Sequence, residues 1–358
     1  MLIPRPRFPI RQMVLMGCLP NFLKKLVYRL KGYRIGKNVS IGFGSVIVGD
    51  DVTIGDHASI SFLSFVRGRH IKIGDHVQIG ATTFIDTPFI EIGDGSKINE
   101  QVFVGGLQFP DSKLVIGRNC QIMQMSFINP CRSITIGDDS GIGGDCLLFG
   151  HTSWLSQLEG YAVDFEPIEI GKSVSLSWRV FVLPGTKIGD GAVIGANSLV
   201  NRNIPPRCLA IGYPARVVSK FPEFPKDLSV EEKARLFENM VREMILFFQG
   251  SGLRCEGPGP DYTIFRTKKR GLKGTKGWRL RVAVESAGER IVNPLPANVD
   301  VFLSLKKISV EDRRKLNGLN IMWFDVENKE HSVSTNELGD EIALFLRRYG
   351  IRFFSVRD

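Results

Sequence analysis

The chain has 358 residues, of which 43% are hydrophobic and 23% are charged, and its formal net charge is +10. At roughly 150 residues per domain this length predicts about two domains, and the balance of apolar and charged residues excludes a disordered tail and a membrane channel. No apolar run approaches the roughly 20 residues that cross a bilayer, and the run Met13–Leu19 does not fit a signal peptide. The six cysteines form no CxxC pair, so we expect reduced thiols in a cytoplasmic protein.

Residues 1–34 form a basic N-terminal segment, since residues 1–49 contain nine Lys or Arg and no Asp or Glu. Within it, the sequence from Pro20 to Lys31 predicts an amphipathic helix. Its apolar face consists of Phe22, Leu23, Leu26, Val27 and Leu30. We expect this face to plug the open end of the fold that follows. Peripheral contact of the basic charges with an anionic membrane is compatible with that arrangement.

From residue 35 onward, the chain repeats an aliphatic residue followed by Gly. The aliphatic positions are Ile35, Ile41, Ile54, Ile73, Ile79, Ile92, Ile116, Ile136, Ile142, Ile170, Ile188 and Ile194. Four residues after most of them stands a small or β-branched residue, as in Ser45, Cys120 and Cys146. Two inward positions in six residues, with turn residues between them, predict a short strand and a corner.

Three such strands close a triangular coil, and the aliphatic residues are buried only when coils stack. The positions Ile35, Ile54, Ile73 and Ile92 are 19 residues apart, which is one coil plus one residue. The repeat predicts about eight coils over residues 35–219. Two excursions, at residues 105–113 and 150–167, interrupt the coils, and such loops on a regular solenoid commonly carry function.

This pattern resembles the hexapeptide-repeat acyltransferases, with more than ten hexads in register. The resemblance implies a mainly β fold, namely a left-handed parallel β-helix. The stretch 127–219 is similar to the branch that acetylates hydroxyls of sugars and polysaccharides. It implies acetyl-CoA as the co-substrate, no metal, and a homotrimer with the active site between subunits.

The same resemblance implies that His151, at the start of the second excursion, is the catalytic base. Transfer of an acyl group from a thioester to an alcohol needs a base that removes the hydroxyl proton, and histidine titrates in the suitable range. Asn129 matches the asparagine that holds the acceptor hydroxyl. The backbone N–H of Trp178 matches the donor that faces the thioester carbonyl.

Further matched positions concern the coenzyme. The resemblance implies that acetyl-CoA is bound by Ser177, Trp178, Ala196, Arg202 and Arg216, with the two arginines near its phosphates. Pro205-Pro206 is expected to end the last coil, because proline cannot supply a ladder N–H. His57 and His76 are 19 residues apart and should stack at one corner. They lack the third histidine that a zinc site would need, so exposed turn histidines are expected.

Residues 226–358 are predicted to form a separate α/β domain of unassigned role. The capping box Ser229–Glu232 begins a helix that ends at Gly250, and a second helix is expected over about Asn336–Tyr349. Strands are expected at Tyr262–Arg266, Arg279–Val284, Val299–Leu305, Ile321–Val326 and Ile351–Val356. Residues 262–284 also contain eight Lys or Arg and no acid, which indicates contact with an anionic polymer or with phosphate.

Together these features predict an acetyl-CoA-dependent O-acetyltransferase that modifies a saccharide or glycolipid hydroxyl during surface polysaccharide assembly. An enzyme that acetylates an antibiotic or an amino-sugar nitrogen remains an alternative, as does a non-catalytic scaffold or binding subunit. Nucleic acid is not expected as a partner. The sequence does not identify the acceptor, the position that is acetylated or the length of the acyl chain.

Overall fold

The computed structural model describes residues 10–152, 154–257, 259, 261–266, 277–284, 299–333 and 336–356. The chain divides into two compact units, Met1–Asp227 and Leu228–Asp358. Each unit is described below by itself. Within the described residues, no helix is both long enough and apolar enough to cross a membrane.

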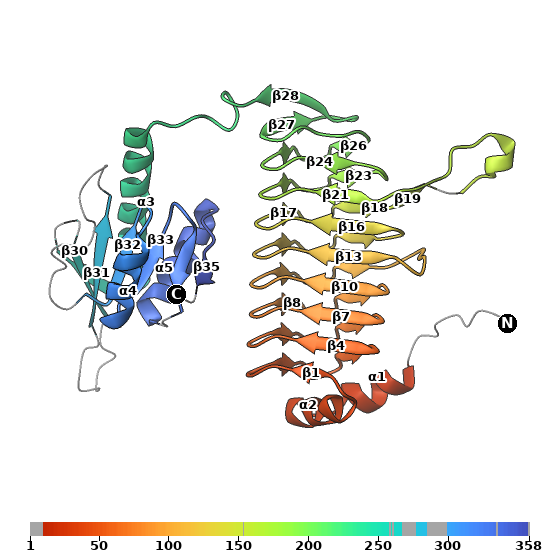
Figure 1. Cartoon of the computed structure of the whole chain (residues 1–358), viewed down its shortest axis with the longest axis horizontal. Coiled ribbons are helices and arrows are strands. Elements are labelled where there is room, and N and C mark those ends of the chain that lie inside the picture. Colours follow the sequence, from red (N-terminus) through yellow and green to blue (C-terminus); the bar gives the residue numbers. More distant parts are fainter. Residues whose placement is uncertain are drawn as a thin grey trace. The chain divides into compact units, whose positions relative to one another are not determined.

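The first unit is built from three long sheets of short strands (Figure 1). The first sheet contains β1 (Arg34–Ile35), β4 (Asp51–Ile54), β7 (His70–Ile73), β10 (Phe89–Ile92), β13 (Lys113–Ile116), β16 (Ser133–Ile136), β21 (Ile168–Ile170) and β24 (Lys187–Ile188). The second contains β2 (Ser40–Ile41), β5 (Ser59–Ile60), β8 (Gln78–Ile79), β11 (Lys97–Ile98), β14 (Gln121–Ile122), β17 (Gly141–Ile142), β22 (Ser175–Leu176), β25 (Val193–Ile194), β27 (Cys208–Ile211) and β28 (Arg216–Lys220). The third contains β3 (Val46–Val48), β6 (Phe65–Arg67), β9 (Phe84–Asp86), β12 (Phe103–Val104), β15 (Phe127–Asn129), β18 (Leu147–Phe149), β23 (Phe181–Val182) and β26 (Leu199–Val200).

The chain passes through the three sheets in turn, so the fold is a parallel β-helix. Ile35 lies opposite Ile54, and Ile54 lies opposite Ile73, as the 19-residue spacing predicts. These isoleucines pack in one continuous core along the coils. Each coil therefore buries the apolar face of its neighbour, which is the physical reason for the repeat.

The small inward positions form a second, polar ladder inside the same core. Ser96 Oγ donates to the Gly117 carbonyl, and Ser140 Oγ donates to the Gly171 carbonyl. Cys146 Sγ donates to the Ser177 carbonyl at 3.1 Å. Burial raises the pKa values of Cys120 and Cys146 to about 11, so both are neutral thiols that act as core residues.

The expectation that Pro205-Pro206 ends the last coil is wrong. Strand β27 follows the two prolines and pairs in parallel with β25, where Val193 lies opposite Leu209. The prolines occupy the turn between the Ile188–Ile204 bridge and β27, where no ladder N–H is needed. Strand β28 then folds back antiparallel on β27 and ends the second sheet.

Two helices, α1 (Ile10–Gly17) and α2 (Asn21–Leu30), precede the first coil. The predicted helix is present, but only part of the predicted face is covered: Val27 packs against the core, and Leu23 is half-buried. The buried residues of α2 are Lys24 and Tyr28, whereas Phe22, Leu26 and Leu30 are 67%, 54% and 80% exposed.

The first coil presents unpaired backbone groups at its open end, and this explains which face of α2 is buried. Lys24 Nζ donates to the carbonyls of Gly42 (2.5 Å) and Ser45 (3.1 Å), and the Ile47 N–H donates to the Tyr28 hydroxyl at 2.9 Å. Burial lowers the pKa of Lys24 and raises that of Tyr28 to about 12. Polar tips on long side chains satisfy these groups, which leucine or phenylalanine cannot do.

The described residues of the second unit form one mixed sheet and three α-helices. The sheet runs in the order β29 (Leu253–Glu256), β30 (Asp261–Arg266), β31 (Gly277–Ala283), β32 (Val301–Ser304), β33 (Met322–Asp325), β34 (Glu330–Ser332) and β35 (Phe354–Val356). The predicted capping box begins α3 (Val230–Gly250), and Asn336 caps α5 (Glu337–Leu346), which leads into a 3₁₀ turn, η2 (Arg347–Tyr349). The sequence reading missed α4 (Val310–Gly318), because this segment has few apolar residues and Ser309 at its start is its main signal. In the predicted basic tract, residues 267–276 lie outside the described residues.

We expect Tyr28→Phe to lower the free energy of unfolding by about 1–3 kcal/mol, because the Ile47 N–H would lose its partner in a dry core. Denaturant unfolding measures the effect. Tyr213→Phe is the matched control, since Tyr213 is exposed and its change should leave the midpoint within error. Equal midpoints for the two variants would contradict the assignment of Tyr28 as a cap.

Candidate active site

The second excursion begins where strand β18 leaves the third sheet, and this places His151 beside Asn129. Asn129 ends β15, which pairs with β18 so that Asn129 lies opposite Phe149. Two residues later, His151 begins the short hairpin β19 (His151–Thr152) and β20 (Asp164–Phe165). Asn129 Nδ2 and His151 Nδ1 are 3.1 Å apart. The structure thus brings together the predicted base and the predicted acceptor-binding residue.

Asn129 is buried, and its amide lies close to the backbone of the first excursion. A Cβ built on Gly106 would lie 2.6 Å from Asn129 Nδ2, so only glycine leaves room there. The φ of Gly106 is +120°, a conformation that also favours glycine. Gly106 is therefore a site residue that sequence reasoning missed, although the Gly105-Gly106 pair at the start of an excursion is a signal that could have found it.

His151 is half-buried between two aromatic rings. Its ring centroid lies 6.1 Å from that of Phe149 and 6.4 Å from that of Phe165, with the Phe165 ring nearly parallel. Burial lowers the pKa of His151 below its usual value of 6.5. The imidazole is consequently neutral near pH 7, the state in which it can accept a proton.

The two excursions contact each other beside this histidine. The rings of Phe109 and Phe165 meet edge to face at 5.4 Å, and the Arg132 guanidinium lies 3.9 Å from the Phe109 ring centroid. Thr152 Oγ1 donates to Asp164 across the hairpin at 3.2 Å. Beyond the β19–β20 hairpin, the second excursion projects from the coils and carries a 3₁₀ turn, η1 (Gln157–Glu159) (Figure 1). Its tip exposes Trp154 and Leu158 almost completely.

The predicted coenzyme residues lie at a different corner of the coils. The Trp178 turn joins β22 of the second sheet to β23 of the third, whereas His151 lies beyond the far end of the third sheet. The Asn197 N–H donates to the Trp178 carbonyl at 3.0 Å, so the turns that contain Ser177-Trp178 and Ala196 stack. Within one chain, the width of the third sheet separates this corner from the Asn129–His151 pair.

The local features of this corner are compatible with the predicted contacts. Within the described part of the chain, the Trp178 N–H has no hydrogen-bond partner. The indole packs against the preceding coil, where a Cβ on Gly144 would lie 2.6 Å from the ring. Arg202 and Arg216 are both exposed, and neither forms an ion pair with a described acid. The coenzyme roles of these residues remain predictions.

No group of three His, Cys, Asp or Glu suited to a metal ion occurs among the residues that the structure describes. The rings of His57 and His76 stack at one corner, with centroids 4.8 Å apart and planes within 3°, as their spacing predicts.

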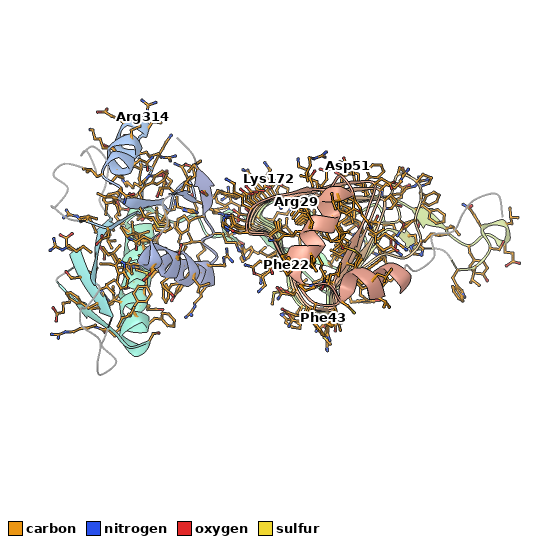
Figure 2. All side chains as sticks on the ribbon, turned by 90° about the horizontal axis from the view of Figure 1, so that it is seen from below. Phe22, Arg29, Phe43, Asp51, Lys172 and Arg314 are labelled. Carbon is orange, nitrogen blue, oxygen red and sulfur yellow. The ribbon has the colours of Figure 1, made fainter. Side chains whose placement is uncertain are left out.

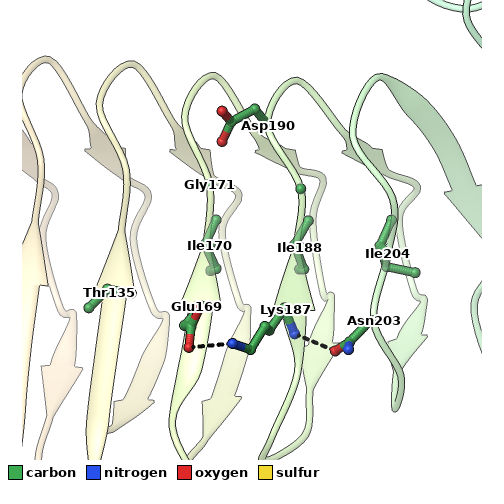
Figure 3. Close-up of a pocket in the computed structure, with 10 residues that line it drawn as sticks. Thr135, Glu169, Ile170, Gly171, Lys187, Ile188, Asp190, Asn203 and Ile204 are labelled. Carbon is green, nitrogen blue, oxygen red and sulfur yellow. Dashed lines mark hydrogen bonds and ion pairs between the residues drawn. The ribbon is translucent and has the colours of Figure 1, made fainter.

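A separate depression of about 400 Å³ lies on the outer side of the first sheet (Figure 3). An ion pair between Glu169 and Lys187 crosses it, and none of the predicted site residues lines it.

The repeats agree with a known family. The family model described as the hexapeptide repeat of succinyl-transferase matches residues 167–202, which include strands β21 to β26. Over these residues the chain is similar to the hexapeptide-repeat transferases. Outside this match, the parallel strand order and the stacked isoleucines extend the same repeat to the first coil.

Named proteins resemble parts of this hexapeptide-repeat segment. A Staphylococcus aureus protein provisionally named an acetyltransferase is 52% identical over 54 residues, which are 15% of this chain and 27% of that protein. The Escherichia coli protein provisionally named the lipopolysaccharide biosynthesis O-acetyl transferase WbbJ is 32% identical over 114 residues, which are 29% of this chain and 58% of that protein. The chain thus spans only part of the length of each relative. Among solved structures, a hexapeptide-repeat acetyltransferase of Vibrio cholerae is 19% identical, with a TM-score of 0.28, over 59% of this chain and 86% of that one.

We expect Gly106→Ala to lower the free energy of unfolding by about 1–3 kcal/mol, because the new methyl group would displace the Asn129 amide. Gly141→Ala is the matched control, since a Cβ there meets nothing within 4 Å. Thermal unfolding of both variants measures the difference. If Gly106→Ala unfolds at the temperature of the unchanged protein, Gly106 does not hold Asn129.

Proposed function

We propose that the chain is an acetyl-CoA-dependent O-acetyltransferase that modifies a saccharide hydroxyl, in a cytoplasmic step of surface polysaccharide or glycolipid assembly. The observation that carries the proposal is the contact between His151 and Asn129 at the start of the long excursion. The match of residues 167–202 to the hexapeptide repeat of succinyl-transferase supports the reaction class. The partial similarity to WbbJ supports a saccharide acceptor.

In this proposal His151 acts as a general base. Its neutral imidazole removes the proton of the acceptor hydroxyl while the oxygen attacks the thioester carbonyl carbon of acetyl-CoA. The C–S bond then breaks, and the imidazolium returns the proton to the departing thiolate. The scheme needs no acyl-enzyme, because the side chain that His151 contacts among the described residues is the Asn129 amide and not a Cys or Ser nucleophile.

Asn129 acts in this scheme as a positioning residue for the imidazole. An amide turned by 180° fills the same space, and that orientation places its oxygen against His151 Nδ1. Nδ1–H then donates to Asn129, and the lone pair of Nε2 is left for the acceptor proton. The predicted contact of Asn129 with the acceptor hydroxyl is retained as a second part of the proposal.

The Trp178 N–H is proposed to donate to the oxyanion that develops on the thioester carbonyl. Its lack of a partner within the described residues supports this role. Ser177 and Ala196 would line the pantetheine arm, and Arg202 and Arg216 would meet the coenzyme phosphates. These residues lie one sheet width away from His151, so a second copy of the chain must complete the site.

A stack of phenylalanines supports assembly of the β-helix with further copies. One ring per coil follows the outer side of the third sheet, with neighbouring centroids 4.9–5.4 Å apart. The rings are Phe65, Phe84, Phe103, Phe127, Phe149 and Phe181. Phe149 of this phenylalanine ladder lies beside His151, so burying the exposed part of the ladder, such as Phe103, against another subunit would also close the site. We propose a homotrimer on this basis.

We expect His151→Ala to lower kcat by about 100-fold or more without weakening coenzyme A binding, because the base is lost while the coenzyme corner is intact. Because burial lowers the pKa of His151, the unchanged enzyme should lose kcat/KM only below pH 6.5. Thiol release from acetyl-CoA with a panel of saccharide acceptors measures both. A folded His151→Ala variant with full turnover would refute the mechanism.

The acetylated product also separates the two acceptor classes. An O-acetyl ester is removed by mild alkali or hydroxylamine, whereas an N-acetyl amide resists both. An alkali-stable product would show that the acceptor atom is an amine nitrogen and not a saccharide hydroxyl oxygen. Release of no thiol with any acceptor, together with no binding of coenzyme A, would favour a scaffold.

We expect Phe103→Glu to convert the trimer into monomers and to abolish activity, because it places a charge in the middle of the phenylalanine ladder. Light scattering gives the mass, and turnover is measured on the same sample. Val218→Glu is the control, since Val218 is exposed and lies on β28, outside the third sheet. An active monomer of the unchanged chain would refute the shared site.

A further inference from the structure

Helix α2 has two faces with different tasks. Lys24 and Tyr28 point into the first coil and bond its free backbone groups. Phe22, Leu26 and Leu30 are four residues apart, so they form one stripe on the opposite, exposed side. Figure 2 shows Phe22 and Arg29 on this helix, where it crosses the end of the coils. Capping of the β-helix therefore does not use the stripe.

Further apolar side chains of the N-terminal part of the chain are exposed. Val14 and Leu15 on α1 are exposed, and so is Phe43 at a corner of the first coil. Isolated exposed apolar residues are normal on a soluble protein, but a group of this size marks an interaction site. We call Val14, Leu15, Phe22, Leu26 and Leu30 the N-terminal apolar stripe.

Positive charge surrounds this stripe. Lys25, Lys31 and Lys37 form no ion pair with any described acid, and Arg29 bonds only the carbonyls of Ile35 and Gly36 within that part of the chain. Residues 1–49 contain nine bases and no acid. Lysine and arginine can lay their apolar stems along a hydrophobic surface while the charged ends reach phosphate groups.

We propose that the N-terminal apolar stripe and its basic rim dock the protein on a bilayer that contains anionic lipids. The apolar side chains would enter the boundary between headgroups and acyl chains, and the bases would meet lipid phosphates. Helix α2 has 10 residues and is about 15 Å long, half of the roughly 30 Å hydrocarbon core. It lies in the interface and does not span it.

Charge favours a bilayer over a second copy of this surface. Two copies that meet through their stripes would oppose Lys25, Lys31 and Lys37 with the same three bases, and no acid in residues 1–49 could compensate. An anionic bilayer supplies both the apolar layer and the opposite charge. This inference does not rest on the proposed acetyl transfer, because docking is measured by binding alone.

The test uses the full chain and vesicles of phosphatidylcholine with or without phosphatidylglycerol. We expect co-sedimentation with the anionic vesicles at about 0.1 M salt, at least tenfold weaker binding to the neutral ones, and release at about 1 M salt, where the Debye length falls from about 10 Å to about 3 Å. No binding to anionic vesicles at the lower salt would overturn the proposal. Equal binding to both vesicle types would also overturn it.

Two matched triple variants locate the surface. Phe22→Ser, Leu26→Ser and Leu30→Ser together should reduce binding at least tenfold and leave the unfolding midpoint unchanged, because Lys24 and Tyr28 still cap the coil. The control carries Leu246→Ser, Leu319→Ser and Leu344→Ser, three similarly exposed leucines in the second unit. Unchanged binding of the first variant, or equal loss in both, would refute the location. A change of oligomeric mass in the first variant alone, without loss of vesicle binding, would assign the stripe to a second copy instead.

Discussion

The six-residue repeat depends on one constraint, which is that a coil cannot bury its own isoleucines. Each short strand has only one or two inward side chains, and these become dry only when another coil lies on either side. The 19-residue spacing from Ile35 to Ile92 keeps each isoleucine directly over the previous one. The inward Ser and Cys positions add hydrogen bonds to the next coil without changing that spacing. Almost all functional variety must therefore arise where the repeat is interrupted or where it ends.

The two excursions show how an interruption creates a site. Strand pairing sets Asn129 and Phe149 opposite each other, and the chain then leaves the coil at His151. The imidazole receives its environment from both excursions, since Phe165 comes from the second and contacts Phe109 of the first. These two aromatic rings, Phe109 and Phe165, belong to segments that leave the coils. The lowered pKa of His151 thus follows from the place where the repeat stops.

The sequence allowed prediction of the features that depend on periodicity. The strands, their register, the stack of His57 on His76 and the capping box at Ser229 all follow from spacing that local chemistry enforces. The contact of His151 with Asn129 also follows from register, once the strands are placed. What the sequence did not reveal depends on contacts between distant segments. Gly106 lies against an amide 23 positions further along the chain; the Gly105-Gly106 pair indicates a special backbone there, but it does not identify the side chain that is contacted.

Helix α2 is a case in which a local sequence pattern is clear but does not predict which side of the helix is buried. An amphipathic pattern predicts that the apolar side is buried, because burial of apolar area is the commonest reason for such a pattern. Here the surface to be covered is a ring of free carbonyl and N–H groups, and leaving these unbonded costs more than leaving three apolar side chains exposed to water. Lys24 and Tyr28 therefore take the inner side, and the apolar side faces outward. An outward apolar side next to uncompensated bases is a poor arrangement for a protein surrounded only by water. It becomes favourable when that side meets an anionic bilayer, so capping and docking can be the tasks of opposite faces of one helix.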